Sequence, residues 1–140
     1  YINNILMILE YLSAFILLNV LDYGYILLNK SKIKKYIASI QLEPTKFKYK
    51  YVFITYVLIA YASILFALPK IRDDHIVKDS IIYGLSLGVV IYSISNLHNM
   101  SVFKKQNKYL ICSDIIIRSI SLSIVLYITK RTSVFFKHVI

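Results

Sequence analysis

The stretch Tyr51–Leu68, YVFITYVLIAYASILFAL, decides the fold class because it contains no charged residue. Thr55 and Ser63 are its small polar side chains, and they form no polar face. A bilayer core of about 30 Å requires roughly 20 apolar residues in a helix that rises about 1.5 Å per residue. A surface helix of a soluble protein would instead show an apolar stripe opposite a polar face. The stretch therefore predicts a membrane-spanning helix.

Three further stretches have a similar length and character, namely Ile5–Leu28, Ser80–Leu97 and Tyr109–Thr129. They are continuous apolar runs without the period-two alternation of a membrane barrel, which favours helices. The first is too long for a secretory signal and has no basic residue before it, so we expect a retained helix. The sequence predicts an all-α, polytopic membrane protein: one domain over residues 1–140, a bundle of four transmembrane helices at about 5–28, 51–68, 80–97 and 109–129.

Composition excludes several other classes of protein. The chain of 140 residues is 58% apolar and 17% charged, whereas soluble domains average about 45–50% and 25%. This hydrophobicity excludes a disordered chain. The single cysteine, Cys112, excludes an internal disulfide scaffold. Despite a formal charge of +10, the basic residues cluster between apolar runs, which argues against a nucleic-acid binder.

The connections between the stretches carry the basic charge. Asn29–Lys50 contains seven lysines and one acid, and His98–Lys108 contains three lysines and no acid. These two connections share a side of the membrane and hold ten basic residues, against six in Pro69–Asp79 and the tail. The positive-inside rule predicts that residues 29–50 and 98–108 are cytoplasmic and that both termini lie on the opposite side.

An amphipathic segment lies within the first connection, near residues 32–42. Ile33, Tyr36, Ile37 and Ile40 follow the i, i+3, i+4, i+7 spacing of one helix face. We expect a short interfacial helix whose lysines face anionic headgroups, with a plain solvated basic loop as the alternative. The lysines expected to contact lipid headgroups or an acidic partner are Lys32, Lys34, Lys35, Lys46, Lys48, Lys50, Lys104, Lys105 and Lys108.

Polar side chains occur at one level of the predicted bundle. Asp22 lies about 9 Å below the membrane face that bears the first connection, and Asp114 about 7–8 Å below the face that bears the third. Those faces are the same, and the third helix ends there with Asn96, His98 and Asn99. Since intramembrane ionisable groups usually face a bundle interior or water, these side chains are expected to cluster.

Arg118 follows Asp114 by four residues, so the two lie on one helix face and can form an ion pair. In one interpretation the pair neutralises itself and holds the fourth helix to its neighbours. In the other, the cluster Asp22, Asn96, His98, Asn99, Asp114 and Arg118 borders a polar cavity open to the cytoplasmic face.

Gly84 and Gly88 form a G-x-x-x-G pattern in the third helix, and Tyr92 and Asn96 continue the same row. Two glycines allow another backbone to approach closely in a membrane. We expect intramolecular helix packing, with homodimerisation as the alternative.

The order of these features resembles the family catalogued as domain of unknown function 2177, predicted four-helix membrane proteins of bacteria and some large DNA viruses. The similarity lies in Leu21–Tyr25, an Asp followed by an aromatic residue; in Phe66–Pro69, a proline that closes the second helix; in Tyr92–Ser101; and in the later Asp114. It extends over roughly Asp22 to Val125. The resemblance implies the fold and the position of a site, but no reaction.

The chain departs from the family pattern at three of these positions. Asn96 replaces an acid, His98 replaces a threonine, and Arg118 replaces a small glycine. If the shared acids of the family bind a ligand or a proton, the charge of that site differs in this chain.

Other catalytic and metal-binding patterns are missing from the sequence. Cys112 and three scattered histidines lack zinc-site spacing. Three glycines supply no phosphate-binding loop, and no Gly-x-Ser-x-Gly elbow occurs. Asp73–His75 is better explained as a solvated turn than as a metal site. We therefore predict no metal and no cofactor.

Two functions remain open from the sequence. The first is a non-enzymatic structural or assembly component of a membrane, with a viral membrane as one candidate and anionic lipid or a larger assembly as partners. The second is an enzyme or carrier for a lipid-like substrate or a proton, acting at Asp22, Asn96, Asn99 and Asp114.

Overall fold

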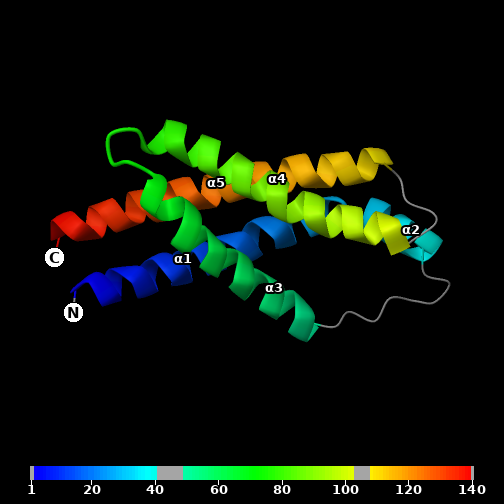
Figure 1. The fold of residues 1–140 in the computed structure, drawn as a ribbon. Coiled ribbons are helices and arrows are strands. Elements are labelled where there is room, and N and C mark those ends of the chain that lie inside the picture. Colours follow the sequence, from blue (N-terminus) through cyan, green and yellow to red (C-terminus); the bar gives the residue numbers. More distant parts are fainter. Residues whose placement is uncertain (1, 41–48, 103–107, 140) are drawn as a thin grey trace.

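The computed structural model describes residues 2–40, 49–102 and 108–139, and nearly all of them are helical (Figure 1). The helices are α1 (Ile2–Leu28), α2 (Lys30–Ile40), α3 (Tyr49–Ala62), α4 (Ile76–Val102) and α5 (Lys108–Val139). α3 continues into a π-helical turn, Ser63–Ala67, and a 3₁₀ turn, Leu68–Lys70.

Four long helical segments run up and down as an antiparallel bundle (Figure 1). Among the described residues, four segments are long and apolar enough to cross a membrane: Asn4–Leu28, Lys50–Lys70, Ile76–His98 and Lys108–Val139. Both chain ends lie at one end of the bundle, and α2 lies at the other (Figure 1). The predicted all-α fold with four membrane-spanning helices is therefore confirmed.

The helices extend further than the apolar runs from which they were predicted. α4 begins at Ile76 and ends at Val102, where the prediction had 80–97, and α5 continues to Val139, well beyond Thr129. Hydropathy marks only the part of a helix that crosses hydrocarbon, whereas backbone hydrogen bonding continues into the headgroup region. The predicted ranges therefore cover the apolar parts of helices that continue beyond them.

The end of α3 departs from regular α-helix before a proline. The Ser63 hydroxyl donates to the Ile59 carbonyl at 2.7 Å, and the π-helical turn begins at the same residue. Pro69 then lies inside the 3₁₀ turn. Proline has no N–H to donate and clashes with the preceding helical turn, so a wider turn before it relieves the crowding and ends the span.

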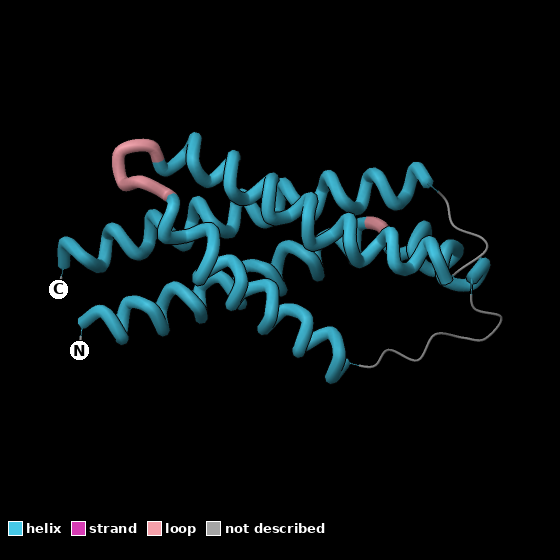
Figure 2. The backbone as a smooth tube through the Cα atoms, viewed as in Figure 1, coloured by secondary structure: helices cyan, strands magenta, loops and turns pink. Residues whose placement is uncertain are grey.

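The described loop between α3 and α4 is short (Figure 2). Ion pairs hold it in place. Asp79 accepts hydrogen bonds from the backbone N–H of Arg72 at 3.1 Å and from its Nε at 2.9 Å. Asp73 pairs with Lys130 of α5 at 2.8 Å. The Lys130 ammonium lowers the pKa of Asp73, and the hydrogen bond and ion pair to Asp79 raise the pKa of Arg72. These contacts fix the loop against two helices.

Glycines bring α4 and α5 into close contact. A Cβ added to Gly88 would lie 2.6 Å from the Cα of Ser119, and one added to Gly84 would overlap the Cα of Ser123 in the same way. Neither position can accept a larger side chain without moving a helix backbone. Because lipid gives helices no hydrophobic reason to associate, this close packing is what joins them.

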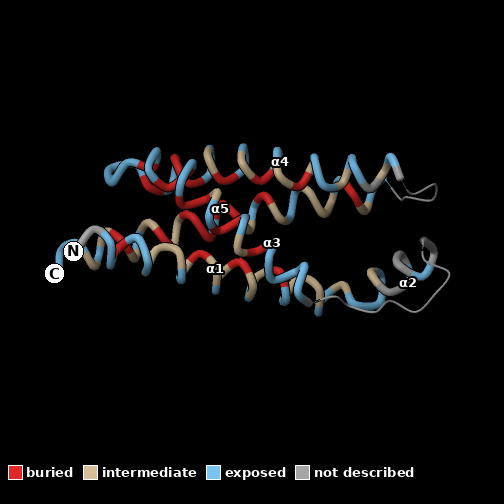
Figure 3. Tube along the Cα trace, turned by 60° about the horizontal axis from the view of Figure 1, so that its bottom comes forward, coloured by how far each residue is buried: buried red, intermediate tan, exposed pale blue. Residues whose placement is uncertain are grey.

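The buried residues lie on the inner faces of the helices, and the outer faces are exposed (Figure 3). Many of the exposed residues are large and apolar. Leu18, Ala60, Leu122 and Leu126 are at most 1% exposed. Large apolar residues such as Val20 and Ile94 are more than 60% exposed. An apolar exterior of this extent suits lipid as the surrounding solvent.

α2 follows α1 after a turn at Asn29. The Asn29 amide side chain donates to the Tyr25 carbonyl at 3.1 Å, and the Ile33 N–H donates to the Asn29 carbonyl at 2.9 Å. A helix is therefore present where the amphipathic segment was predicted, beginning at Lys30. The side chains of Tyr36, Ile37 and Ile40, which form most of the predicted apolar stripe, lie outside the described residues.

Candidate functional site

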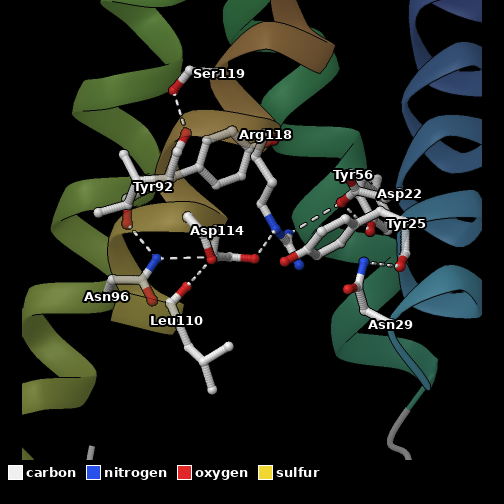
Figure 4. A network of polar contacts seen from close by, with 12 residues as sticks. Asp22, Tyr25, Asn29, Tyr56, Tyr92, Asn96, Leu110, Asp114, Arg118 and Ser119 are labelled. Atoms are coloured by element: carbon white, nitrogen blue, oxygen red, sulfur yellow. Dashed lines mark hydrogen bonds and ion pairs between the residues drawn. The ribbon is translucent and has the colours of Figure 1, made fainter. Parts of the chain in front are cut away.

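One arginine joins two carboxylates from different helices (Figure 4). Arg118 of α5 donates from Nε to Asp114 Oδ1 at 2.9 Å and from Nη1 to Asp22 Oδ2 of α1 at 3.1 Å. We call Asp22, Asp114 and Arg118 the ion triad. Asp22 is almost fully buried, with 3% of its side chain exposed, whereas Arg118 and Asp114 are each 25% exposed.

The sequence brings the ion triad together through helix geometry and topology. The i, i+4 spacing of Asp114 and Arg118 places both on one face of α5. Asp22 lies near the end of α1 and Asp114 near the start of α5. Because these two helices run antiparallel, the end of one and the start of the other reach the same level of the bundle.

Two further side chains donate hydrogen bonds to the carboxylates. The Tyr56 hydroxyl of α3 donates to Asp22 Oδ2 at 2.5 Å. The Asn96 amide of α4 donates to Asp114 Oδ2 at 3.3 Å and also to the Tyr92 carbonyl at 2.8 Å. The ion triad is thus bonded to every membrane-spanning helix, and each charged group has a polar partner.

Tyr92 lies beside the triad with an unpaired hydroxyl. The Arg118 guanidinium carbon is 5.5 Å from the centre of the Tyr92 ring, a distance at which a cation is attracted to the ring face. The residue is only 4% exposed. Its hydroxyl is buried and has no hydrogen-bond partner among the described residues, although buried tyrosine hydroxyls usually have one.

A cavity of about 610 Å³ borders the triad. Asp114, Arg118, Asn96 and Tyr92 form its polar side. The remaining lining residues are Tyr25, Ile26, Asn29, Lys32, Ile33, Val52, Thr55, Tyr56, Ile59, Ile91, Ser95, Leu110, Ile111, Ser113 and Ile117. Pockets of about 300–1,000 Å³ with apolar linings and a few converging polar groups are the usual binding sites for small molecules.

The lining of the cavity includes exposed residues of several helices. These include Val52 and Thr55 of α3 and Ser95 of α4, all of which are exposed. Lys32 of α2 is also exposed and lies at the end of the bundle where α2 is found. A molecule can therefore reach the polar side from outside the helices.

The remaining residues predicted for the cluster lie elsewhere. His98 is exposed and does not line the cavity. The side chain of Asn99 is outside the described residues. Of the predicted basic residues, Lys32, Lys35, Lys50 and Lys108 are exposed. The described residues do not include Lys46, Lys48, Lys104 and Lys105, and they do not include the side chain of Lys34.

Tyr56 is the residue of the site that sequence reasoning missed. With thirteen tyrosines in the chain, one more in an apolar run gives no signal by itself. Ser119 and Ser123, the partners of the glycines, were also missed. Their i, i+4 spacing forms a row of small residues on α5, a pattern that could have identified them.

A second polar contact lies nearer the chain ends. Ser133 of α5 donates a hydrogen bond to Glu10 of α1. One helical turn further along α1, Ser13 donates to Thr129 at 3.3 Å. These contacts join α1 to α5 near the opposite membrane face. They also give a hydrogen-bond partner to Glu10, the acid in the first half of α1.

The described residues contain no group of three His, Cys, Asp or Glu side chains that could hold a metal ion. In the loop after α3, Asp74 lies 3.4 Å from His75, whereas Asp73 turns to Lys130 at 2.8 Å. These three neighbours in sequence therefore do not converge.

The model of a family described as "Predicted membrane protein (DUF2177)" matches residues 7–129, most of the chain. The chain belongs to this family, as the resemblance in the sequence predicted, and is an integral, multi-pass membrane protein. No curated protein and no solved structure matched it.

Proposed function

We propose that this DUF2177 family member binds an amphiphilic, lipid-like molecule in the cavity beside the ion triad. The observation that carries the proposal is the cavity itself, about 610 Å³ in volume, in which the ionic groups of Asp114 and Arg118 adjoin a lining surface that is mostly apolar. An amphiphile has the same division between a polar head and an apolar chain.

The level of the cavity in the bundle supports this assignment. Asp114 lies within the first two turns of α5, so the polar side of the cavity is close to a membrane face. The exposed lining residues Val52, Thr55 and Ser95 face the surroundings of the bundle, which the apolar exterior indicates to be lipid. A lipid could place its headgroup against the triad while its chain leaves along Val52 and Ile91.

Filling the cavity tests the proposal. Ser95 lines the cavity, while its neighbour Ile94 is 65% exposed and does not. We expect Ser95→Trp to lose the lipid that copurifies with the wild-type protein, and Ile94→Trp to retain it. Native mass spectrometry of the purified, detergent-solubilised protein measures the bound lipid directly.

Equal retention by both tryptophan variants would contradict the proposal, because it would place the lipid on the outer surface. Absence of any bound lipid from the wild type after gentle solubilisation would also contradict it. Circular dichroism and size-exclusion chromatography check that both variants are folded.

A second candidate is a structural or assembly component of a membrane, for which a viral membrane is one setting. The ion triad favours it, because a hydrogen-bonded cluster that joins four membrane-spanning helices also serves to hold helices together. In this function the exposed lysines Lys32, Lys35, Lys50 and Lys108 would bind anionic headgroups or an acidic partner from the cytoplasmic side.

Charge removal tests this second candidate. Replacing Lys32 and Lys35 with glutamine should reduce retention of phosphatidylglycerol relative to phosphatidylcholine in native mass spectra. Replacing Lys70 and Lys78, which lie beside the loop at the opposite end, is the matched control. Unchanged lipid preference in the Lys32 and Lys35 variant would count against a headgroup-binding face.

A further inference from the structure

The charges of the ion triad do not balance. Two carboxylates, Asp22 and Asp114, share one guanidinium, Arg118, which leaves a formal charge of −1 among the three groups. Besides Arg118, the described cation that lines the cavity is Lys32, which is exposed at the end of the bundle. Uncompensated charge in a membrane interior is unfavourable, and such groups normally pair with an opposite charge.

Asp114 is the carboxylate that a bound molecule can reach. Asp22 is almost fully buried and already accepts from Tyr56 and Arg118, whereas a quarter of the Asp114 side chain is exposed and lines the cavity. A molecule in the cavity therefore meets a carboxylate that faces it, with the guanidinium turned toward both acids (Figure 4).

The Tyr92 hydroxyl is an independent indication of a ligand. It is buried and has no partner among the described residues, and the residue that carries it lines the same cavity. A hydroxyl oxygen and a carboxylate are both acceptors for a group with several N–H donors. Aromatic rings also attract cations, and Tyr25, Tyr56 and Tyr92 all line the cavity.

We propose that the cavity selects an amphiphile with a cationic, ammonium-bearing head, which Asp114 and the Tyr92 hydroxyl receive. This inference rests on the proposed function and names its ligand class. An ammonium group would balance the charge of the triad and supply the partner that the Tyr92 hydroxyl lacks. An anionic head would add a second uncompensated charge beside Asp114.

Three probes of equal chain length test the proposal: tetradecylamine, tetradecanol and tetradecanoate. Each is added to the purified protein after delipidation, and retention is measured by native mass spectrometry. We expect the amine to bind about tenfold more tightly than the alcohol, since hydrogen bonds to a charged group contribute about that much. Retention of tetradecanoate should be the weakest of the three.

Two variants test whether the preference for the amine arises at Asp114 in the cavity. Asp114→Asn should bring the amine to the level of the alcohol, whereas Asp74→Asn, an exposed acid in the loop at the other end, should leave the preference unchanged. If Asp114→Asn fails to fold, the ranking of the three probes on the wild type still decides the matter. Equal retention of amine and alcohol, or stronger retention of tetradecanoate, overturns the proposal.

The outcomes also separate this inference from the proposed function. If all three probes bind equally and Ser95→Trp abolishes their binding, the cavity takes amphiphiles but has no preference for a cation. If Ser95→Trp changes none of them, the probes do not occupy the cavity, and both proposals are overturned.

Discussion

Arg118 and Asp22 are 96 positions apart in sequence, and their side chains meet at 3.1 Å inside the bundle. The contact joins the first membrane-spanning helix to the last. Because Arg118 also binds Asp114 on its own helix, one guanidinium holds two carboxylates in place. The triad holds the helices together, and two of its members, Asp114 and Arg118, also line the cavity, so stability and ligand binding are expected to be coupled.

Removal of the arginine should destabilise the protein strongly. Arg118→Gln leaves two carboxylates facing each other without a cation, and we expect a loss of about 3 kcal/mol in the free energy of unfolding. Unfolding by sodium dodecyl sulfate, followed by circular dichroism, measures it. Combining Arg118→Gln with Asp22→Asn and Asp114→Asn removes all three charges and should restore much of the loss. A triple variant as unstable as the single one would show that charge balance is not the cause.

The Tyr56 hydroxyl should contribute measurably to stability. Tyr56→Phe removes its hydrogen bond to Asp22 and leaves a buried carboxylate with one donor fewer. The expected loss is about 1.5–3 kcal/mol, the range for hydrogen bonds to charged groups. Tyr61→Phe, on the same helix but 56% exposed, is the control and should leave the unfolding curve in place. Equal curves for the two variants would contradict the role of Tyr56.

Replacement of Tyr92 by phenylalanine, in contrast, should not destabilise the protein. Its hydroxyl is buried without a partner among the described residues, and removal of an unpaired buried polar group is neutral or stabilising. We expect Tyr92→Phe to unfold at the same or a slightly higher detergent concentration than the wild type. Retention of tetradecylamine should nevertheless decrease. A clear loss of stability would mean that the hydroxyl has a structural partner.

Glycine substitutions should distinguish close packing from open space. Gly88→Ala places a methyl group 2.6 Å from the Ser119 backbone, which must then move. Overpacking of this kind typically destabilises by about 1–3 kcal/mol. Gly24→Ala has nothing within 4 Å of the added atom and should be neutral or stabilising, because alanine favours helix. Thermal unfolding in detergent compares the two, and an equally stable Gly88→Ala protein would be inconsistent with the helix contact.

The ion pair that holds the loop between α3 and α4 should weaken in acid. The hydrogen bond from Lys130 lowers the pKa of Asp73, so this pair stabilises the fold above the ordinary carboxyl pKa and loses its effect as the pH falls through the lowered value. NMR titration should find a higher pKa for Asp73 in Lys130→Gln than in the wild type. The difference should shrink at high salt because Asp73 is 60% exposed. An unchanged pKa in Lys130→Gln would exclude the pair in solution.

Much of the site could be predicted from local spacing. The i, i+4 relation of Asp114 and Arg118 predicts the ion pair that the structure contains. The distances of Asp22 and Asn96 from their helix ends placed them at the same level as Asp114, and the structure shows Asp22 bound to Arg118 and Asn96 bound to Asp114. For His98 this reasoning was not sufficient. The residue lies at the same level along the bundle, but its side chain is exposed. The level of a residue along a helix does not determine the direction in which its side chain points.

The sequence by itself determined the solvent, the number of spans and the depth of each ionisable group. These follow from hydropathy and from the rise per residue of a helix. Both depend only on residues that are close in sequence, so the packing partner of a helix need not be known. The tertiary structure alone decided how each helix is rotated about its axis. That rotation depends on contacts between distant residues, such as Gly88 against Ser119. It determines that Tyr56 and Arg118 turn toward Asp22, and that a cavity remains beside them.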